Sequence, residues 1–167
     1  MHNKTALIFG GQGSQFTGMG KRIYDSFSEA RSVFALASDV VGYDVATMCF
    51  ESSQKELNKT IYCQICTFTV EMAIYEVFKK KNIRLNAVAG FSLGEYSALV
   101  AAEIIDIKTA FELVNARARA MENEVCDNIG NMVAIINLDI EKVEAICKKF
   151  GAGKVAIANY NSFNQIV

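Results

Sequence analysis

Residues 86–100, with the sequence NAVAGFSLGEYSALV, join a short apolar run to a predicted helix. Residues 86–90 are small and mostly apolar, which predicts a buried strand, and residues 94–100 predict the helix that follows. Between them, residues 90–94 fit G-x-S-x-G, the pattern of a sharp strand-to-helix turn that projects a serine above a sheet. The glycines two positions before and after Ser92 allow such a turn to close without side-chain clashes.

Ser92 is therefore a candidate nucleophile. The helix that follows it directs free N–H groups and the positive end of its dipole toward a reacting carbonyl group. The backbone N–H of Leu93 is then a natural donor to an oxyanion. The alternative is a plain strand-to-helix turn in which Gly90 and Gly94 only permit close packing.

A second apolar run, residues 5–9, ends at a glycine-rich segment, residues 10–20. This arrangement predicts a buried strand followed by a tight loop. The loop fails the dinucleotide fingerprint because Phe16 stands where the third glycine is needed, and it fails the P-loop because Met19 replaces the lysine. Its backbone could supply a second oxyanion donor, or the glycines could simply form a tight connection.

The rest of the chain predicts alternating strands and helices. Helices are expected over residues 21–41, in two pieces, and over residues 67–80 and 107–124. Alternation with continuously apolar strands indicates an α/β fold with a parallel sheet covered by helices on both faces.

The pattern changes near residue 128, so we predict two domains, 1–127 and 128–167. The second domain is expected to hold a strand (132–136), a helix (140–150) and another strand (154–158), with a further strand starting at 165. The chain is expected to stop inside a structural element.

Composition excludes several classes of protein. Apolar residues make up 51% of the 167 residues and charged residues 21%, which excludes a disordered chain. The net charge is −1 and no lysine or arginine cluster forms a basic face, so we expect no nucleic-acid partner. We also expect no membrane span and no secretion signal, and five cysteines without such a signal favour a cytoplasmic protein with reduced thiols.

A base for Ser92 is not evident. The sequence contains one histidine, His2, close to the N-terminus. Glu95 and Asp106 are nearby carboxylates, but Glu95 is expected to be solvated or to cap its helix. The C-x-x-C formed by Cys63 and Cys66 lacks the further ligands that a zinc site requires, so we predict core packing there and no metal site.

Arg117 lies at the border of an apolar stripe on the predicted helix 107–124. The stripe consists of Ile107, Ala110, Phe111, Val114, Ala118 and Met121. An arginine at such a border either pairs with a carboxylate of the protein or binds one on a ligand. Arg119 points away from the stripe and is expected to be solvated.

The chain resembles the malonyl-CoA:acyl carrier protein transacylase family, the acyltransferases of fatty acid and polyketide synthesis, essentially from end to end. The resemblance depends on four motifs in this order: FGGQGSQ at residues 9–15, GFSLGEYSAL at 90–99, VNAR at 114–117 and NYNS at 159–162.

The resemblance implies that Ser92 becomes malonylated and that the N–H groups of Gln12 and Leu93 form an oxyanion hole. It implies that Arg117 binds the free carboxylate of the malonyl group and that Gln64 lines the site. The expected fold is an α/β-hydrolase-like core followed by the start of a ferredoxin-like subdomain, incomplete at the C-terminus. The implied substrates are malonyl-CoA and acyl carrier protein, with no cofactor apart from the coenzyme A thioester itself.

Three sequence departures and one difference in length accompany the resemblance. Phe91 replaces the usual histidine before the nucleophile, Ile65 replaces a proline, and residues 163–164 replace Pro-Gly. In the family the catalytic histidine lies downstream of the position of Val167, so we expect weak activity from this chain by itself. The alternatives are a non-catalytic fragment that self-associates or binds a partner, and a serine acyl-hydrolase.

Overall fold

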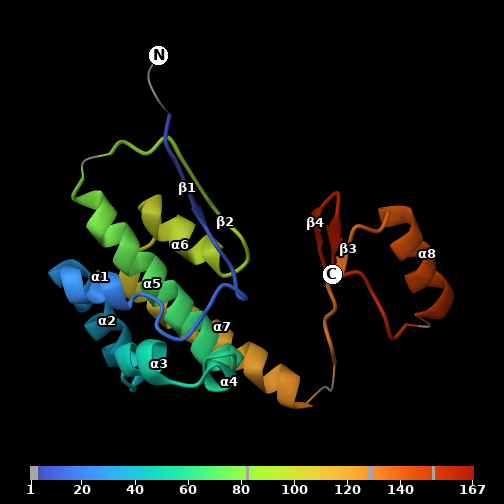
Figure 1. Cartoon of the computed structure of the whole chain (residues 1–167), viewed down its shortest axis with the longest axis horizontal. Helices are drawn as coiled ribbons and strands as arrows, with labels where there is room; N and C mark the ends of the chain where they lie inside the picture. Colours follow the sequence, from blue (N-terminus) through green and yellow to red (C-terminus); the bar gives the residue numbers. More distant parts are fainter. Residues whose placement is uncertain (1–3, 82, 128–129, 152) are drawn as a thin grey trace. The chain divides into compact units, whose positions relative to one another are not determined.

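The computed structural model describes residues 4–81, 83–127, 130–151 and 153–167 (Figure 1). The chain divides into two compact units, Met1–Asp127 and Asn128–Val167. Each unit has its own elements, and each is described separately below.

The first unit contains a parallel pair of strands. β1 (Ala6–Phe9) pairs with β2 (Ala87–Gly90), with Ala6 opposite Ala87 and Phe9 opposite Gly90. The ladder extends one residue further at one end, where Asn86 N–H donates to the Thr5 carbonyl over 2.8 Å. The predicted α/β class with parallel strands is confirmed.

The helices of this unit form its core. They are α1 (Lys21–Ser26), α2 (Ser28–Val41), α3 (Val45–Glu51), α4 (Gln54–Leu57), α5 (Thr60–Lys79), α6 (Gly94–Ala101) and α7 (Ile107–Asp127). α5 packs against both α2 and α7, and α6 packs against both strands (Figure 1). Large side chains with no solvent exposure, such as Phe68, Phe111 and Met72, fill the space between these helices.

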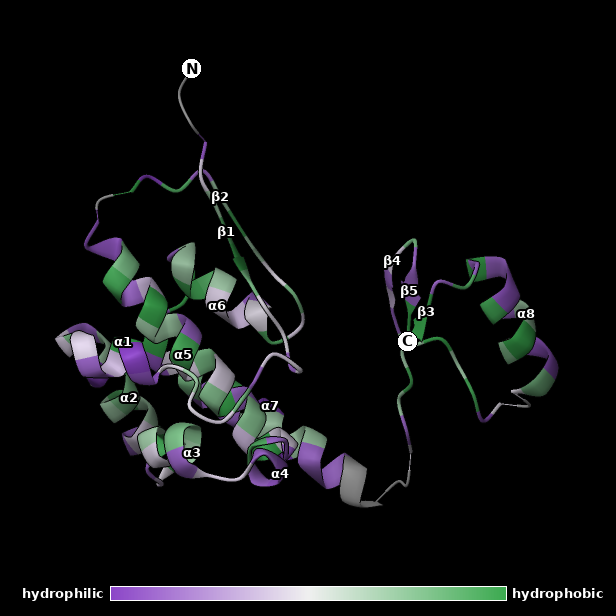
Figure 2. Cartoon of the chain, in the orientation of Figure 1, coloured by the Kyte–Doolittle hydropathy of each residue, from purple (hydrophilic) through white to green (hydrophobic). Residues whose placement is uncertain are grey.

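Helices cover only one face of the β1–β2 pair among the described residues. Burial alternates along β1, so that Phe9 is buried while Ile8 is 79% exposed. Burial alternates in the same way along β2, where Ala87 and Ala89 are exposed. β1 is nonetheless hydrophobic along its length (Figure 2). The prediction of a sheet covered on both faces is therefore wrong for the described unit, because its helices gather on one side.

α5 differs from its prediction. It begins at Thr60 rather than Thr67, so Cys63 and Cys66 lie within the helix, where both are fully buried. Core packing of the two cysteines is thus confirmed. Ile74 of this helix is 49% exposed. By length and composition, α5 is apolar enough to cross a membrane. However, 56% of its most apolar 18-residue stretch is buried in this unit, as is typical of a core helix.

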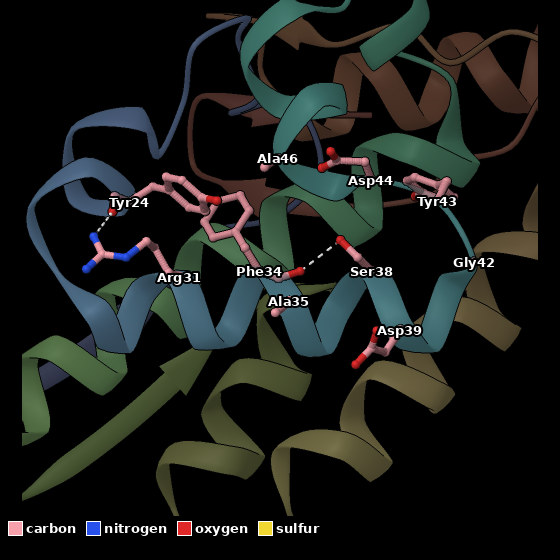
Figure 3. A pocket seen from close by; sticks show the side chains of 10 residues that line it. All are labelled: Tyr24, Arg31, Phe34, Ala35, Ser38, Asp39, Gly42, Tyr43, Asp44 and Ala46. Carbon is pink, nitrogen blue, oxygen red and sulfur yellow. Dashed lines mark hydrogen bonds between the residues drawn. The ribbon is translucent and has the colours of Figure 1, made fainter.

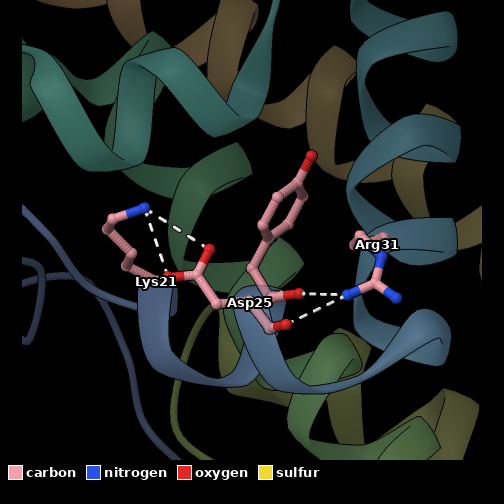
Figure 4. Close-up of polar contacts among 4 residues, drawn as sticks. Lys21, Asp25 and Arg31 are labelled. Atoms are coloured by element: carbon pink, nitrogen blue, oxygen red, sulfur yellow. Dashed lines mark hydrogen bonds and ion pairs between the residues drawn. The ribbon is translucent and has the colours of Figure 1, made fainter.

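The predicted break within residues 21–41 occurs at Phe27, between α1 and α2. An arginine of α2 stabilises the end of α1, because Arg31 Nη1 donates to the carbonyl groups of Tyr24 and Asp25 over 2.9 and 3.2 Å (Figure 4). Lys21 pairs with Asp25 one turn along α1 over 3.3 Å. The two hydrogen bonds from Arg31 satisfy carbonyl groups that the end of a helix leaves without partners.

The second unit is a small antiparallel sheet with one helix. β3 (Ile135–Ile136), β5 (Gln165–Ile166) and β4 (Tyr160–Ser162) pair in that order, and α8 spans Ile140–Phe150. The helix prediction is confirmed, and so is the strand beginning at 165.

The predicted strand over residues 154–158 is wrong, and the strand predicted over 132–136 shrinks to its last two residues. Residues 155–158 are apolar because they line a hollow of about 350 Å³ together with Val143 and Ile146 of α8. The sheet is antiparallel rather than part of a βαβ unit, since β4 turns directly back into β5.

Candidate active site

Ser92 lies in the turn between β2 and α6, at the end of the parallel strands. Its backbone φ is 53°, in the left-handed region that residues other than glycine rarely adopt. Phe91 N–H donates to the Phe9 carbonyl over 3.1 Å, which continues the strand ladder up to the turn. Gly94 N–H then donates to the Phe91 carbonyl over 3.0 Å and closes it. The Ser92 side chain is exposed, as the prediction of a nucleophile requires.

The glycines on either side of Ser92 are required by close backbone contacts. A Cβ on Gly90 would lie 2.0 Å from the carbonyl oxygen of Gly94, and a Cβ on Gly94 would lie 2.3 Å from the carbonyl oxygen of Gly10. Both distances are far shorter than a carbon and an oxygen can approach. The G-x-S-x-G spacing therefore reflects packing of the turn on itself and on the first glycine-rich loop.

Arg117 of α7 reaches Ser92. Its Nη2 donates to Ser92 Oγ over 3.0 Å, and its Nη1 donates to Gln64 Oε1. The residue is partly buried, as its place at the border of the stripe predicts. None of the ion pairs among the described residues involves Arg117.

Gln64 accepts a hydrogen bond from the Arg117 guanidinium inside the core. It is fully buried in α5, and its Nε2 contacts Met121 Sδ over 3.3 Å. With its amide group engaged at both ends, Gln64 orients one edge of the Arg117 guanidinium and leaves the other edge toward Ser92. The structure thus brings together three of the residues selected from the sequence.

The glycine-rich loop lies directly on the Ser92 turn. A Cβ on Gly11 would be 2.9 Å from the Phe91 carbonyl oxygen. Gly13 N–H donates to Gln15 Oε1 over 2.8 Å, and Gln15 Nε2 donates to Asn58 Oδ1 over 2.8 Å, which ties the loop to the end of α4.

The two predicted oxyanion donors occupy different environments. Gln12 is exposed in the glycine-rich loop, whereas the Leu93 side chain is fully buried under the start of α6. Within the described residues, the hydrogen bonds include none donated by the backbone N–H of either residue. No acceptor in this part of the chain uses either N–H group, so both are available to a ligand.

Residues 6–167 match the family described as "Acyl transferase domain". The chain belongs to this family. The malonyl CoA-acyl carrier protein transacylase of Haemophilus influenzae is 40% identical over 167 residues, covering 98% of this chain and 54% of that protein. The protein of the same name from Escherichia coli K12 is 38% identical, covering 97% of this chain and 53% of its own length.

Solved structures agree with this assignment. The transacylase from Clostridium perfringens superposes with a TM-score of 0.87 at 38% identity, covering 98% of this chain and 52% of that structure. A malonyl-transacylase in complex with a type II PKS acyl-carrier protein gives a TM-score of 0.88 at 36% identity, covering 98% and 54%. The acyl transferase chain therefore spans about half the length of the relatives it matches.

A base for Ser92 is not found within the described part of this acyl transferase chain. Glu95 is exposed on α6, and the Asp106 carboxylate accepts from Thr109 N–H over 2.9 Å at the start of α7. His2 lies outside the described residues. The described residues also hold no group of three histidine, cysteine or acidic side chains suited to a metal ion.

The first unit also contains a hollow that Ser92 does not line and that is larger than the hollow of the second unit. It has a volume of about 500 Å³ and is lined mainly by α2 and the start of α3, including Tyr24, Arg31 and Asp44 (Figure 3). Arg31 is already bound to carbonyl groups and Asp44 caps α3. The hollow therefore offers structural groups rather than a nucleophile.

Sequence reasoning missed Glu71. It lies on α5, and its Oε2 accepts a hydrogen bond from Ser97 Oγ over 2.5 Å. Burial raises the pKa of this carboxyl group, while Ser97 and the backbone N–H of Gly10 act in the opposite direction. The signal was present, because Glu71 is the only charged residue in the apolar stretch 60–75.

Proposed function

We propose that this chain carries the nucleophile and the carboxylate-binding site of a malonyl-CoA:acyl carrier protein transacylase. One observation carries the proposal: the guanidinium of Arg117 donates to the exposed Ser92 hydroxyl and to buried Gln64 without a carboxylate partner from the described chain. A cation fixed beside a nucleophile suits an acyl group with a second, negatively charged end.

The proposed reaction proceeds through an ester on Ser92. Ser92 Oγ attacks the thioester carbonyl of malonyl-CoA, a C–O bond forms, and the C–S bond breaks. Coenzyme A leaves as a thiol and takes up the equivalent of the proton that the hydroxyl loses. In the second half, the phosphopantetheine thiol of acyl carrier protein attacks the ester and regenerates the Ser92 hydroxyl.

Backbone groups would stabilise the negative charge that develops on the carbonyl oxygen. The Leu93 N–H stands at the start of α6, where the helix dipole is positive, and the Gln12 N–H belongs to the loop packed against the turn. In acyl-transfer enzymes, loss of one such donor costs about 3–4 kcal/mol of transition-state stabilisation.

Arg117 would bind the free malonyl carboxylate. Two parallel N–H groups of a guanidinium match the two oxygens of a carboxylate, and such charge-assisted pairs are stronger than neutral hydrogen bonds. In this scheme, the Nη2 group that now donates to Ser92 turns to the ligand, while Gln64 keeps the guanidinium in place. The names of the relatives support malonyl-CoA and acyl carrier protein as the substrates.

The test is the intact mass of the chain after prolonged incubation with malonyl-CoA or acetyl-CoA. We expect a malonyl adduct on the unmodified chain and none on Ser92→Ala. Arg117→Ala should load malonyl roughly 10- to 100-fold more slowly because it loses a charge-assisted pair, with a smaller effect on acetyl loading.

Arg119→Ala is the matched control. This neighbouring arginine is exposed and donates to Asn115 over 3.2 Å, so its loss should change neither rate. An unchanged malonyl preference in Arg117→Ala would refute the assigned role. Free malonate without a lasting adduct would instead identify an acyl-hydrolase.

A further inference from the structure

Glu71 is a partly buried carboxyl group that the proposed mechanism does not use. It projects from α5 between residues that are largely buried, since Thr69, Met72 and Ala73 have no solvent exposure. A carboxyl group in such surroundings is costly unless donors satisfy both of its oxygens. Its neighbours therefore indicate why the protein keeps it there.

One oxygen of Glu71 is held by the helix that follows the nucleophile. Ser97 Oγ donates to Glu71 Oε2 over 2.5 Å, and Ser97 is fully buried in the first turns of α6. This contact joins α5 to α6 near the helix start that carries the Leu93 N–H.

The other oxygen faces the glycine-rich loop. Glu71 Oε1 lies 3.7 Å from the position that a Cβ on Gly10 would take, an ordinary van der Waals distance, and the Gly10 backbone N–H acts to lower the pKa of the carboxyl group. Gly10 directly follows β1 and begins the loop toward Gln12. The carboxyl group therefore contacts both segments that carry a proposed oxyanion donor.

The loop also packs against the Ser92 turn. The Gly10 carbonyl oxygen lies where it would be 2.3 Å from a Cβ on Gly94. Gly10 thus lies close to both the Glu71 carboxyl group and the backbone of the Ser92 turn. A carboxyl group is suited to this place because its two oxygens can accept from two donors that belong to different elements.

We propose that Glu71 is a positioning residue that ties the glycine-rich loop, residues 10–15, to α6 and so fixes the separation of the Gln12 and Leu93 N–H groups. The consequence for catalysis rests on the proposed function, whereas the tie itself is a property of the fold. Glu71 contacts neither Ser92 nor Arg117 in the hydrogen bonds of the described residues, so it acts through the backbone.

The tie is tested by hydrogen exchange measured by mass spectrometry on the full 167-residue chain. We expect Glu71→Ala to speed exchange of peptides covering residues 10–15 at least about tenfold, beyond any change in α2 or α7, because local opening no longer breaks these contacts. Glu71→Gln keeps the volume and one carbonyl acceptor, so it should restore part of the protection. Glu76→Gln, whose carboxylate pairs with Lys79 further along the same helix, is the matched control and should leave residues 10–15 unchanged.

The catalytic consequence is tested by the initial rate of malonyl loading at several malonyl-CoA concentrations. Glu71→Ala should lower the maximal rate about tenfold with little change in the half-saturating concentration, because the Arg117 site is untouched. Glu71→Gln should recover part of this rate.

The two readouts separate the proposals. If malonyl-CoA never loads the unmodified chain, the proposed function fails. Hydrogen exchange then still tests whether Glu71 positions the loop. Equal acceleration of exchange across all helices in both Glu71 variants, or no acceleration at residues 10–15, would overturn the positioning role. If Glu71→Ala does not fold, the comparison of Glu71→Gln with Glu76→Gln decides in the same way.

Discussion

Ser92 adopts a backbone conformation that is unfavourable for a residue with a side chain. A left-handed φ costs roughly 1–2 kcal/mol per residue other than glycine, so the surrounding contacts must impose it. The contacts that impose it are the close approach of Gly90 to Gly94 and of Gly94 to Gly10. The exposed position of the hydroxyl therefore depends on Gly90 and Gly94, which have no side chains.

Gly90→Ala tests this dependence. The new Cβ would meet the Gly94 carbonyl oxygen, a backbone atom that cannot move without opening the turn. We expect a loss of at least about 3 kcal/mol in the free energy of unfolding, measured by urea denaturation. Gly130→Ala is the control, since nothing lies within 4 Å of its Cβ position. Equal stability of the two variants would contradict the close contact.

Glu71 predicts a pH dependence of stability. Its pKa is raised by burial in the folded state above the value of 4.5 expected in the unfolded chain. The folded state then binds the proton more tightly, so this residue's contribution is fully present below pH 4.5 and is lost as pH rises through the raised pKa. Relative to Glu71→Gln, which does not titrate, the unmodified chain should lose stability as pH rises from 4 to 7. Thermal denaturation across this range measures it, and a difference that grows in the opposite direction would refute the shift.

At the level of single residues, functional side chains that belong to a sequence motif or a helical stripe were predictable. Those without such a pattern were not. The motif predicts an exposed Ser92 at a strand-to-helix turn, and the helical stripe predicts partial burial of Arg117. Gln64 was selected only through the family resemblance. Glu71 was missed because its partners, Gly10 and Ser97, are distant in sequence and no motif links them.

Among the elements, α7 determines where the guanidinium lies. Ala110, Phe111, Val114 and Ala118 are fully buried against the core, and this sets the rotation of the helix that turns Arg117 toward Ser92. The first turn of α7 is held by Asp106, whose carboxylate accepts from the Thr109 hydroxyl over 2.6 Å and from its N–H over 2.9 Å.

Asp106→Ala should lower the melting temperature by a few degrees, because the first turn of α7 loses its capping acceptor. The hydrogen bonds from Thr109 lower the pKa of Asp106, so its contribution is present above the unfolded pKa and fades as pH falls through the folded value. The deficit of the variant should therefore be larger at pH 7 than at pH 2. Asp106→Asn, which still accepts from an N–H, should retain most of the stability. A deficit independent of pH would indicate that the carboxylate's charge has no part in capping.

Elements with a clear helical period were the most predictable. Residues 140–150 and the start of the helix at 107 were predicted correctly because their apolar residues recur every three or four positions. The early turns of α5 were missed because the polar residue Gln64, which is buried there, interrupts an apolar pattern. Residues 154–158 were predicted as a strand because an apolar run lining a hollow and an apolar run in a sheet look alike in sequence.

On the scale of the whole molecule, the described first unit leaves one apolar sheet face uncovered. Ile8 is 79% exposed there, and the chain spans about half the length of its relatives. Self-association stays a prediction, as do the cytoplasmic location and the ferredoxin-like identity of residues 128–167. The parallel pairing of β1 with β2 was predictable, since both strands are short, apolar and followed by a glycine-rich turn.

We also expect the composition of the chain to limit the proposed transfer. Transfer to and from Ser92 requires a group that accepts and returns a proton, and the sequence holds a single histidine, His2. General acid–base catalysis contributes about 10²–10⁴-fold, so we expect malonyl transfer to acyl carrier protein at least about 100-fold slower than by the Haemophilus influenzae relative assayed in parallel. Ser92→Ala measures the uncatalysed background, and His2→Ala tests whether the one histidine contributes. Turnover equal to that of the relative, retained in His2→Ala, would show that another group serves as the base and would make Glu95 the first residue to substitute.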